Sequence, residues 1–237
     1  MKALILNSGI GSRMGKYTRQ FPKCMVRLVK EETILERQLR MLCRAGIKEA
    51  VITTGFMADR LKHYAASIEL PLRLCFVNND EYDTTNYIYS MYLAEDDLQD
   101  DILLLHGDLV FEQNVLENMI NCEKSCMAVS TSCALPEKDF KAVLQDGRIV
   151  RIGIEFFENA VAAQPLYVLR QRLWIKWMKK IEEFYQKGEL TCYAENALNQ
   201  ILDKEILYPY DYGNQLCREV DKEEDLLEVR KAIGNLA

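Results

Sequence analysis

The chain has 237 residues, of which 49% are hydrophobic and 28% are charged. This composition is typical of a globular protein with a substantial core, and it excludes disordered, collagen-like and coiled-coil classes. The length fits one large α/β domain better than two. The formal net charge of −6 gives no overall attraction for nucleic acid or anionic lipid, so any anion must be bound by local groups.

The apolar runs of the sequence indicate a soluble, cytoplasmic protein. The run at 3–6 breaks directly into polar residues and glycine, and it is far too short for a signal peptide. The later run at 102–105 is far shorter than the roughly 20 residues that a membrane helix needs. We therefore expect no membrane insertion, and we expect the eight cysteines to be reduced thiols.

Strands and helices alternate in the first half of the chain. Thr33 and Glu36 form the pattern of a capping box at the start of the first helix, and Gly46 follows its end. The alternation predicts a parallel, Rossmann-like sheet. Buried strands are predicted at 3–6, 50–54, 72–77 and 102–105, and helices at 34–43, 58–66 and 87–98.

The second half of the chain adds antiparallel strands. Asp146-Gly147 lies between the apolar runs 142–144 and 149–152, which is a strong signal for a two-residue hairpin turn. We therefore expect an α/β fold with a mixed sheet and a small antiparallel insertion over a cleft. Further helices are predicted at 115–122, 173–185, 195–202 and from 223 onward, and further strands at 127–131 and 206–210.

The loop after the first strand is the most informative segment. It reads NSGIGSRMGK at 7–16, and glycines that follow a buried strand let backbone N–H groups approach a phosphate closely. Its third glycine comes one residue too late for the dinucleotide fingerprint, and Ile10 and Tyr17 do not fit the phosphate loop of NTPases. Four cations within eleven residues suit a triphosphate, although a solvated loop with incidental charges remains an alternative. These cations are Arg13, Lys16, Arg19 and Lys23.

The pattern Leu-x-x-Gly-x-Gly-Ser-Arg at 6–13, followed by Pro22-Lys23, resembles the signature of the NTP transferases that make sugar nucleotides and CDP-alcohols. The segments TNYIYSMYL at 85–93 and REVD at 218–221 most resemble bacterial phosphocholine and 2-aminoethylphosphonate cytidylyltransferases. The resemblance covers nearly the whole chain, but Asn7-Ser8 stand where most members have two small residues. It implies the nucleotide-diphospho-sugar transferase fold over 1–237, with a nucleotide-binding half at 1–135 and an acceptor-binding half with a metal motif at 136–237.

The resemblance also implies roles for residues at the nucleotide. Lys23 and Arg13 would be catalytic, with Lys23 neutralising charge that develops on the α-phosphate. Asp108 and Asp221 would hold Mg²⁺, an ion that proteins typically bind through one or two carboxylates plus substrate phosphates. The residues implied to bind the nucleotide are Leu6, Asn7, Gly9, Gly11, Ser12, Arg13, Lys23, Asn86 and Ser90.

For the acceptor, the resemblance points to Tyr193 and Glu195, and position in the chain points to Lys141. Tyr193 and Glu195 match the segment that surrounds a quaternary ammonium in phosphocholine enzymes, where aromatic faces attract a cation. Ala194 stands where a large aromatic residue is expected, which favours a smaller or primary amine. Lys141 lies just before the hairpin, in the predicted insertion, and would meet the acceptor phosphate.

Each of these residues also has an ordinary structural explanation, which the sequence leaves open. Asp108 fits a cap for the loop after its strand, and Asp221 with Glu224 fits a capping box for the last helix. The others fit common surface or core positions. Asn86 and Ser90 fit polar surface, Lys141 fits a solvent-facing lysine, and Tyr193 and Glu195 fit a core residue and a helix start.

The sequence thus predicts a cytidylyltransferase that transfers CMP from CTP to a small phospho- or phosphono-amino alcohol and releases pyrophosphate, with Mg²⁺ as cofactor. Phosphocholine, phosphoethanolamine and 2-aminoethylphosphonate are the expected acceptor types. The alternatives are a sugar-1-phosphate nucleotidyltransferase that uses another NTP, and a catalytically silent nucleotide-binding regulatory protein. The sequence leaves open the acceptor, the strictness of the CTP preference, the pathway and the oligomeric state, a homodimer included.

Overall fold

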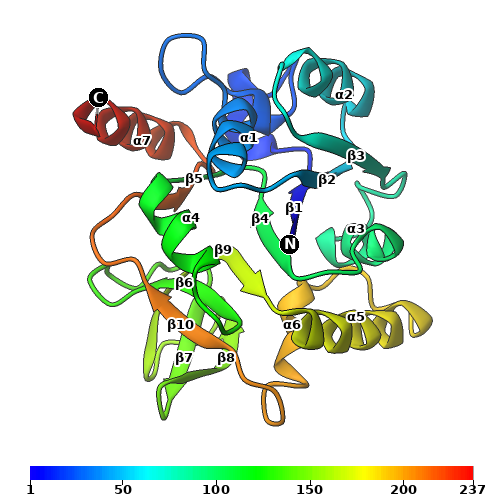
Figure 1. The fold of residues 1–237 in the computed structure, drawn as a ribbon, viewed down its shortest axis with the longest axis vertical. Helices are drawn as coiled ribbons and strands as arrows, with labels where there is room; N and C mark the ends of the chain where they lie inside the picture. The colour runs from blue at the N-terminus through cyan, green and yellow to red at the C-terminus, as the bar shows by residue number, and fades with distance from the viewer. Residues whose placement is uncertain (237) are drawn as a thin grey trace.

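A nine-stranded mixed sheet runs through the computed structural model, which describes residues 1–236 (Figure 1). Its strands are β1 (Lys2–Asn7), β2 (Glu49–Thr54), β3 (Arg73–Asn78), β4 (Ile102–His106), β6 (Cys126–Ser130), β7 (Lys141–Gln145), β8 (Arg148–Gly153), β9 (Ala160–Leu169) and β10 (Tyr208–Asp211). The main path has the order β10-β6-β9-β4-β1-β2-β3, and the β7–β8 hairpin joins it at β9. The mixed sheet expected from the sequence is confirmed.

The parallel half of the sheet follows from continuous apolar runs. β1 pairs in parallel with β2 and β4, and β2 pairs in parallel with β3. The β1 residues Ala3, Leu4 and Ile5 have no exposed surface, because helices cover both faces of the sheet. Parallel strands place their carboxyl ends at one edge, so the loops after β1 and β4 meet there.

Two groups of helices cover the two faces. Apolar residues of α1 (Ile34–Arg44), α2 (Ala58–Ser67) and α4 (Gln113–Ile120) pack on one face. Those of α3 (Tyr87–Leu93), α5 (Gln171–Gln186) and α6 (Ala194–Asn199) pack on the other. The last helix, α7 (Glu223–Leu236), packs against the segment that follows β1. Short 3₁₀ turns complete the helices at Ser12–Tyr17, Lys23–Met25 and Glu95–Asp97.

Local signals placed several element ends correctly. Thr33 Oγ1 accepts a hydrogen bond of 3.1 Å from Glu36 N, which confirms the cap at the start of α1. Asp146 and Gly147 have φ values of 51° and 73°, so both adopt the left-handed conformation that a tight hairpin turn requires. The helix predicted at 87–98 is too long, because α3 ends at Leu93 and a separate 3₁₀ turn follows.

The sequence analysis did not predict β9, although this strand joins the two parts of the sheet. β9 pairs antiparallel with β4, β6 and β7. Its Pro165 argues against a central strand, because proline has no N–H for the ladder. The register of the β6–β9 pair shifts between Met127 and Val129, opposite the stretch that contains Pro165, and this irregularity accommodates the proline.

A second, two-stranded sheet brings the C-terminal part of the chain to the end of β4. It pairs β5 (Leu109–Phe111) with β11 (Cys217–Glu219) in antiparallel fashion. Val220 N then donates a hydrogen bond of 3.0 Å to Asp108 O. This pairing aligns the segment before α7 with the turn after β4.

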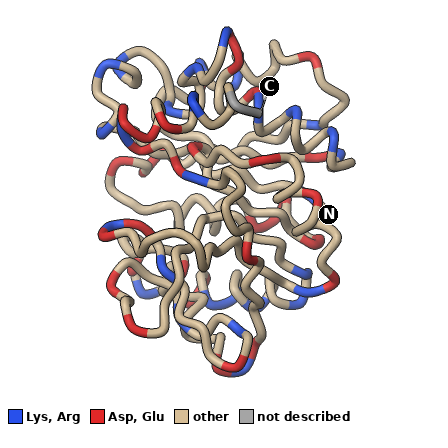
Figure 2. Tube along the Cα trace, turned by 90° about the vertical axis from the view of Figure 1, so that its left-hand side faces the viewer, with Lys and Arg blue, Asp and Glu red and all other residues tan. Residues whose placement is uncertain are grey.

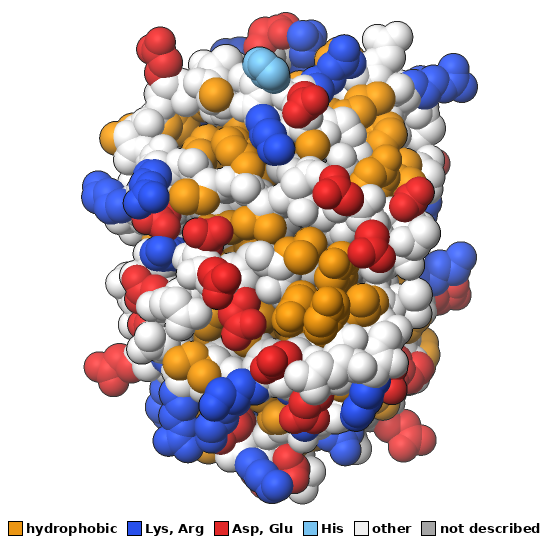
Figure 3. All heavy atoms as spheres, turned by 90° about the vertical axis from the view of Figure 1, so that its right-hand side faces the viewer, with side chains coloured by type: hydrophobic (Ala, Val, Ile, Leu, Met, Phe, Trp, Pro, Cys, Tyr) orange, Lys and Arg blue, Asp and Glu red, His pale blue; other side chains and the backbone are white. Residues whose placement is uncertain are grey.

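Acidic and basic positions are interspersed along the Cα trace in the upper and lower halves of the view in Figure 2. On the side that carries α2, β3 and α3, apolar side chains gather between charged ones (Figure 3). The rings of Tyr92 and Tyr185 stack there with centroids 4.1 Å apart. Within residues 1–236, no helix has both the length and the apolar character needed to cross a membrane. The eight cysteines are free thiols in this part of the chain.

The contact between the ends of β1 and β4 yields a stability prediction. A Cβ atom at position 107 would lie 1.6 Å from Asn7 Oδ1, and Asn7 is buried. We expect Gly107→Ala to lower the free energy of unfolding by about 1–3 kcal/mol, because overpacking forces neighbouring groups to move. Urea unfolding measures this change. Adding Asn7→Ala should restore most of the loss, and a Gly107→Ala protein as stable as the wild type would contradict the packing.

Candidate active site

A cleft of about 660 Å³ opens at the carboxyl ends of β1 and β4. This is the edge at which open α/β sheets bind ligands. All the residues predicted for the nucleotide and the metal line it, as does Tyr193 from the acceptor set. The predicted residues on its wall are Leu6, Asn7, Gly9, Gly11, Ser12, Arg13, Lys23, Asn86, Ser90, Asp108, Tyr193 and Asp221.

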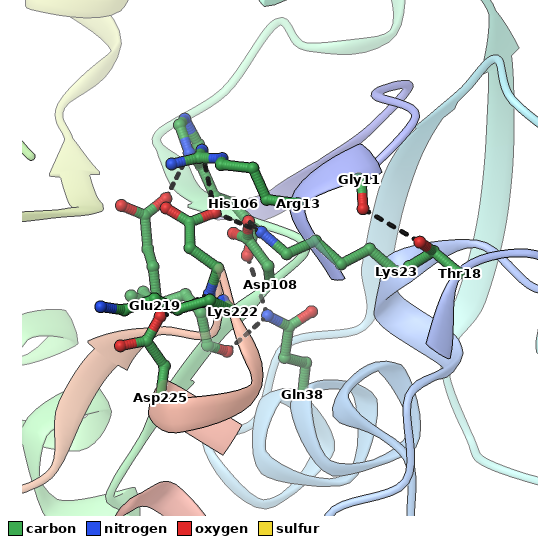
Figure 4. A network of polar contacts seen from close by, with 12 residues as sticks. Gly11, Arg13, Thr18, Lys23, Gln38, His106, Asp108, Glu219, Lys222 and Asp225 are labelled. Atoms are coloured by element: carbon green, nitrogen blue, oxygen red, sulfur yellow. Dashed lines mark hydrogen bonds and ion pairs between the residues drawn. The ribbon is translucent and has the colours of Figure 1, made fainter. Parts of the chain in front are cut away.

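The glycine loop is shaped to let Lys23 reach the cleft. Gly11 has a φ of 66°, a value that favours glycine, and a Cβ atom there would lie 2.9 Å from Lys23 Cβ. Thr18 Oγ1 donates a hydrogen bond of 3.0 Å to Gly11 O, which ties the loop to the turn that follows (Figure 4). Gly11 is therefore required by both its backbone conformation and its contact with Lys23.

Lys23 lies between the two carboxylates that the sequence singled out. Its Nζ atom is 2.5 Å from Asp108 Oδ2 and 2.5 Å from Asp221 Oδ1. Arg13 Nη2 lies 3.0 Å from the same Asp221 oxygen. Figure 4 shows the Lys23 side chain extended toward Asp108 and Arg13 approaching from the loop. The structure thus brings the front loop and the two distant acids into one charged cluster.

The charges in this cluster shift one another's protonation. Burial alone would lower the pKa of Lys23, but the charges of Asp108 and Asp221 outweigh burial and raise it. Burial likewise raises the pKa of Asp108, but Lys23 and His106 more than reverse this effect and hold it below its usual value. At neutral pH Lys23 is therefore a cation that pairs with the Asp108 carboxylate.

Backbone contacts fix the two acids. Gln38 Nε2 donates to His106 O at 2.9 Å and to Leu109 O at 2.8 Å, which clamps the turn that carries Asp108. Asp225 accepts hydrogen bonds of 3.0 Å from Asp221 N and Lys222 N. The carboxylate that caps the start of α7 is therefore that of Asp225. Asp221 points its own carboxylate at Lys23, so the capping-box interpretation of Asp221 and Glu224 is wrong.

A half-buried pair that was not predicted from the sequence lies beside these acids. His106 Nδ1 lies 3.0 Å from Glu219 Oε1, and both residues line the cleft. Burial, with the nearby charge of Asp108, raises the pKa of Glu219 to about 7. Burial lowers the pKa of His106, but its hydrogen bond to the Glu219 carboxylate and the charge of that carboxylate outweigh burial and raise the pKa. His106 stands two residues before Asp108, and Glu219 stands two residues before Asp221. This spacing from the predicted metal ligands could have indicated the pair.

A chain of buried polar side chains joins β1 to α3. Ser90 Oγ donates to Ser8 Oγ at 2.9 Å, and Asn79 Nδ2 donates to Ser90 Oγ at 3.0 Å. Ser90 is therefore buried and links Ser8 to Asn79, so the interpretation of Ser90 as a polar surface residue is wrong. Asn86 caps α3, with its side chain accepting a hydrogen bond of 2.8 Å from Tyr87 N. Asn79, which was not predicted from the sequence, lines the cleft together with Asn86 and Ser90.

Three aromatic rings lie together on the cleft wall. Phe140 and Tyr193 form an edge-on pair with centroids 5.2 Å apart, and Tyr87 is 6.1 Å from Tyr193. All three line the cleft. Phe140 was missed, although it directly precedes a residue that the sequence analysis had selected. An aromatic residue was expected at position 194, where the chain has alanine. Phe140, from a different segment, supplies an aromatic ring beside Tyr193 instead.

Two predicted acceptor residues do not line the cleft. Glu195 has 1% of its surface exposed and accepts hydrogen bonds from Tyr167 Oη, at 2.8 Å, and from Tyr87 Oη. It therefore holds Tyr87 in place. Lys141 is fully buried, and its Nζ atom faces backbone carbonyl oxygens of the loop before it. Because its side chain is buried, the interpretation of Lys141 as a solvent-facing lysine is wrong.

Comparison with known families agrees with this geometry. Residues 3–200 match the MobA-like NTP transferase domain. The chain belongs to this family. This NTP transferase is a nucleotidyltransferase, in agreement with its characterised relatives. Its resemblance to the family, inferred above from the glycine loop and Pro22-Lys23, is confirmed.

The relatives of this NTP transferase include several cytidylyltransferases. It is 27% identical over 223 residues to CTP:phosphoglutamine cytidylyltransferase of Campylobacter jejuni, which covers 88% of this chain and 81% of the relative. It is 33% identical over 208 residues to CMP-5'-(3-aminopropyl)phosphonate synthase of Streptomyces rubellomurinus, covering 84% of this chain but only 33% of that longer protein.

Solved structures confirm the fold of this NTP transferase. CTP:phosphocholine cytidylyltransferase of Streptococcus pneumoniae has a TM-score of 0.77 at 21% identity, covering 98% of both chains. The inositol-1-phosphate CTP transferase of T. maritima has a TM-score of 0.80 at 23% identity, covering 98% of this chain and 95% of the other. The nucleotide-diphospho-sugar transferase type of fold is thereby established.

The position of Lys23 yields a prediction for catalysis. We expect Lys23→Met to lower kcat for pyrophosphate release by about 10²–10³-fold, because a positioned charge is lost where negative charge develops. Lys23→Arg, which keeps a positive charge, should retain more activity than Lys23→Met. The matched control is Lys180→Met, which removes a lysine paired with Glu183 on the surface of α5. Turnover by a folded Lys23→Met protein equal to that of the control would remove Lys23 from the reaction centre.

Proposed function

We propose that this nucleotidyltransferase transfers CMP from CTP to a small phosphorylated or phosphonylated amino alcohol and releases pyrophosphate. The observation that carries the proposal is the convergence of Lys23, Asp108 and Asp221 at the glycine loop. The names of the relatives support cytidine as the base and a small phosphate or phosphonate as the acceptor. The aromatic end of the cleft supports an acceptor that carries a cation.

The glycine loop and Lys23 would bind the triphosphate. Backbone N–H groups of the loop at 9–13 are the donors that suit phosphate oxygens, and Gly9 and Gly11 leave room for a close approach. Arg13 is 68% exposed and reaches across the loop to Asp221, so its guanidinium has room to turn toward a phosphate. The buried chain of Ser8, Ser90 and Asn79 would form the wall beside the nucleoside.

The chemistry is a substitution at phosphorus. An oxygen of the acceptor phosphate or phosphonate attacks the α-phosphorus, and the bond from this phosphorus to the oxygen shared with the β-phosphate breaks. Pyrophosphate leaves with the electron pair of that bond. The attacking oxygen is already anionic at neutral pH, because the second pKa of a phosphate ester is about 6. The site therefore needs positioned positive charge more than a general base, and Lys23 supplies it.

The residues around Lys23 fit a magnesium ion. Asp108 Oδ1 is buried and has no hydrogen-bond partner among residues 1–236, although the other carboxylate oxygen pairs with Lys23. Carboxylate oxygens are the ligands that Mg²⁺ prefers, and one or two of them together with phosphates form a typical site. Asp108 and Asp221 would hold the ion, and Lys23 would move from the carboxylates to the phosphate. When bound, the ion neutralises phosphate charge and orients the reacting groups.

The acceptor end of the cleft suits an organic cation. Tyr87, Phe140 and Tyr193 present aromatic surface, which attracts ammonium groups. The carboxyl groups of Asp139 and Glu219 line the same cleft. A primary ammonium would donate hydrogen bonds to such carboxyl groups, whereas a quaternary ammonium has no N–H donor and would use the rings alone. This combination favours an acceptor that carries an amine.

A pyrophosphate-release screen tests the function. It crosses CTP, UTP, GTP and ATP with phosphocholine, phosphoethanolamine, 2-aminoethylphosphonate, glycerol phosphate and hexose 1-phosphates. We expect CTP with an amine-bearing acceptor to give the highest kcat/KM, by tenfold or more over other NTPs, and EDTA to abolish turnover. Highest activity with a hexose 1-phosphate and another NTP would identify a sugar enzyme. Nucleotide binding without turnover on any pair would identify a silent regulatory protein.

A further inference from the structure

The loop at 131–140 borders two cavities. It joins β6 to β7 without a helix or a strand. The loop borders the active-site cleft and a second cavity of about 1020 Å³, and the two cavities also share Arg13, Glu219 and Asp221. Lys138 and Asp139 line both cavities, whereas Phe140 lines only the cleft and Pro136 and Glu137 only the second cavity. The position of this loop therefore sets the shape of the acceptor end of the cleft.

The ammonium group of Lys141 lies inside this loop. Its Nζ atom is 2.6 Å from Pro136 O, 3.1 Å from Asp139 O and 3.5 Å from Glu137 O. The Phe157 ring covers it, with 4.3 Å from Nζ to the ring centroid. Lys141 has no exposed surface and forms no ion pair within residues 1–236.

This arrangement matches the chemistry of a lysine ammonium. The group has three N–H donors and no acceptor, and here three carbonyl oxygens converge on it. Carbonyl oxygens of an irregular loop have no ladder partners, so those that point into the protein need another donor. Hydrogen bonds from a charged donor are also stronger than those between neutral groups. The loop is therefore folded around an internal cation.

The residues held by Lys141 are the ones that shape the acceptor end. Phe140 directly precedes it, and Phe140 O accepts a hydrogen bond of 3.0 Å from Ala163 N in β9. Asp139, whose carbonyl binds the ammonium, lines the cleft, and burial with the charges of Asp221 and Asp225 raises the pKa of its carboxyl group. Lys141 thus fixes the loop from within, while β9 anchors its end.

We propose that Lys141 is a positioning residue for acceptor recognition. Its ammonium holds the 136–139 loop so that Asp139 and Phe140 stand at the cleft wall. This inference rests on the acceptor part of the proposed function. It predicts that loss of the ammonium loosens the wall, weakens binding of the small acceptor, and lets bulkier acceptors enter, while CTP binding by the glycine loop is preserved.

The experiment compares Lys141→Met, Lys141→Gln and Lys141→Arg in steady-state kinetics. We expect Lys141→Met to raise the KM for the best acceptor about tenfold, a factor that corresponds to about 1.4 kcal/mol, with the KM for CTP within twofold. Lys141→Gln keeps two N–H donors and should lie between Lys141→Met and the wild type. Lys141→Arg keeps the charge and should recover most of the acceptor affinity. The preference for the small acceptor over a bulkier N-alkylated analogue should fall in the same order.

The matched control is Lys124→Met. Lys124 also lies over an aromatic ring, with Nζ 4.4 Å from the Tyr208 centroid, but it is exposed and lines neither cavity. Its removal should change neither KM. Thermal melting and direct titration of CTP show whether each variant is folded, and the Lys141→Gln and Lys141→Arg proteins carry the test if Lys141→Met does not fold.

Two outcomes would overturn the inference. One is an unchanged acceptor KM and selectivity in a folded Lys141→Met protein. The other is an equal rise of the KM values for acceptor and CTP, which would indicate general loss of structure. If the wild type instead prefers an acceptor without an amine, the proposed function fails on that part. The same comparison with the preferred acceptor then tests Lys141 separately.

Discussion

The site depends on one electrostatic constraint: the ammonium of Lys23 must lie between two carboxylates that come from distant parts of the chain. Asp108 follows β4, and Asp221 precedes α7. A buried ammonium and buried carboxylates are each costly without partners, so the three groups stabilise one another only when all three segments are in place. Three parts of the fold position these groups: the glycine loop, the turn after β4 and the β5–β11 sheet.

The ends of β1 and β4 also carry polar atoms that the protein itself leaves unpaired. Asn7 Nδ2, His106 Nε2 and Asp108 Oδ1 are buried and lack hydrogen-bond partners within the described residues. All three residues line the cleft. Buried polar groups without partners are rare in folded proteins and call for a specific explanation. Substrate oxygens and a metal ion are the partners that the proposed reaction would bring to this position.

The sequence predicted what depends on local pattern. Continuous apolar runs located β1, β2 and β4, and the Asp146-Gly147 turn located the hairpin. The same patterns could not locate β9, because Pro165 argues against a central strand and only the irregular register with β6 makes room for it. The three-residue strands β5 and β11 form through long-range pairing, which has no periodic signal.

Side-chain surroundings were the least predictable part of the site. The grouping of Lys23, Asp108 and Asp221 came from the family resemblance, and the structure places them together. Lys141 was assigned to the surface or to the acceptor, since a lysine is rarely buried without an acid. Its burial depends on three carbonyl groups whose directions only the folded loop defines. His106 and Glu219 form a pair only because β11 lies beside the end of β4.

The most direct measurement is a crystal structure of the protein with Mg²⁺ and CTP, or with a CTP analogue that cannot be cleaved between its α- and β-phosphates. The account predicts the α-phosphate beside Lys23 Nζ, the triphosphate along the glycine loop, and the metal bound by Asp108 and Asp221. A nucleotide bound outside this cleft, or an α-phosphate remote from a Lys23 that still pairs with both acids, would contradict the account.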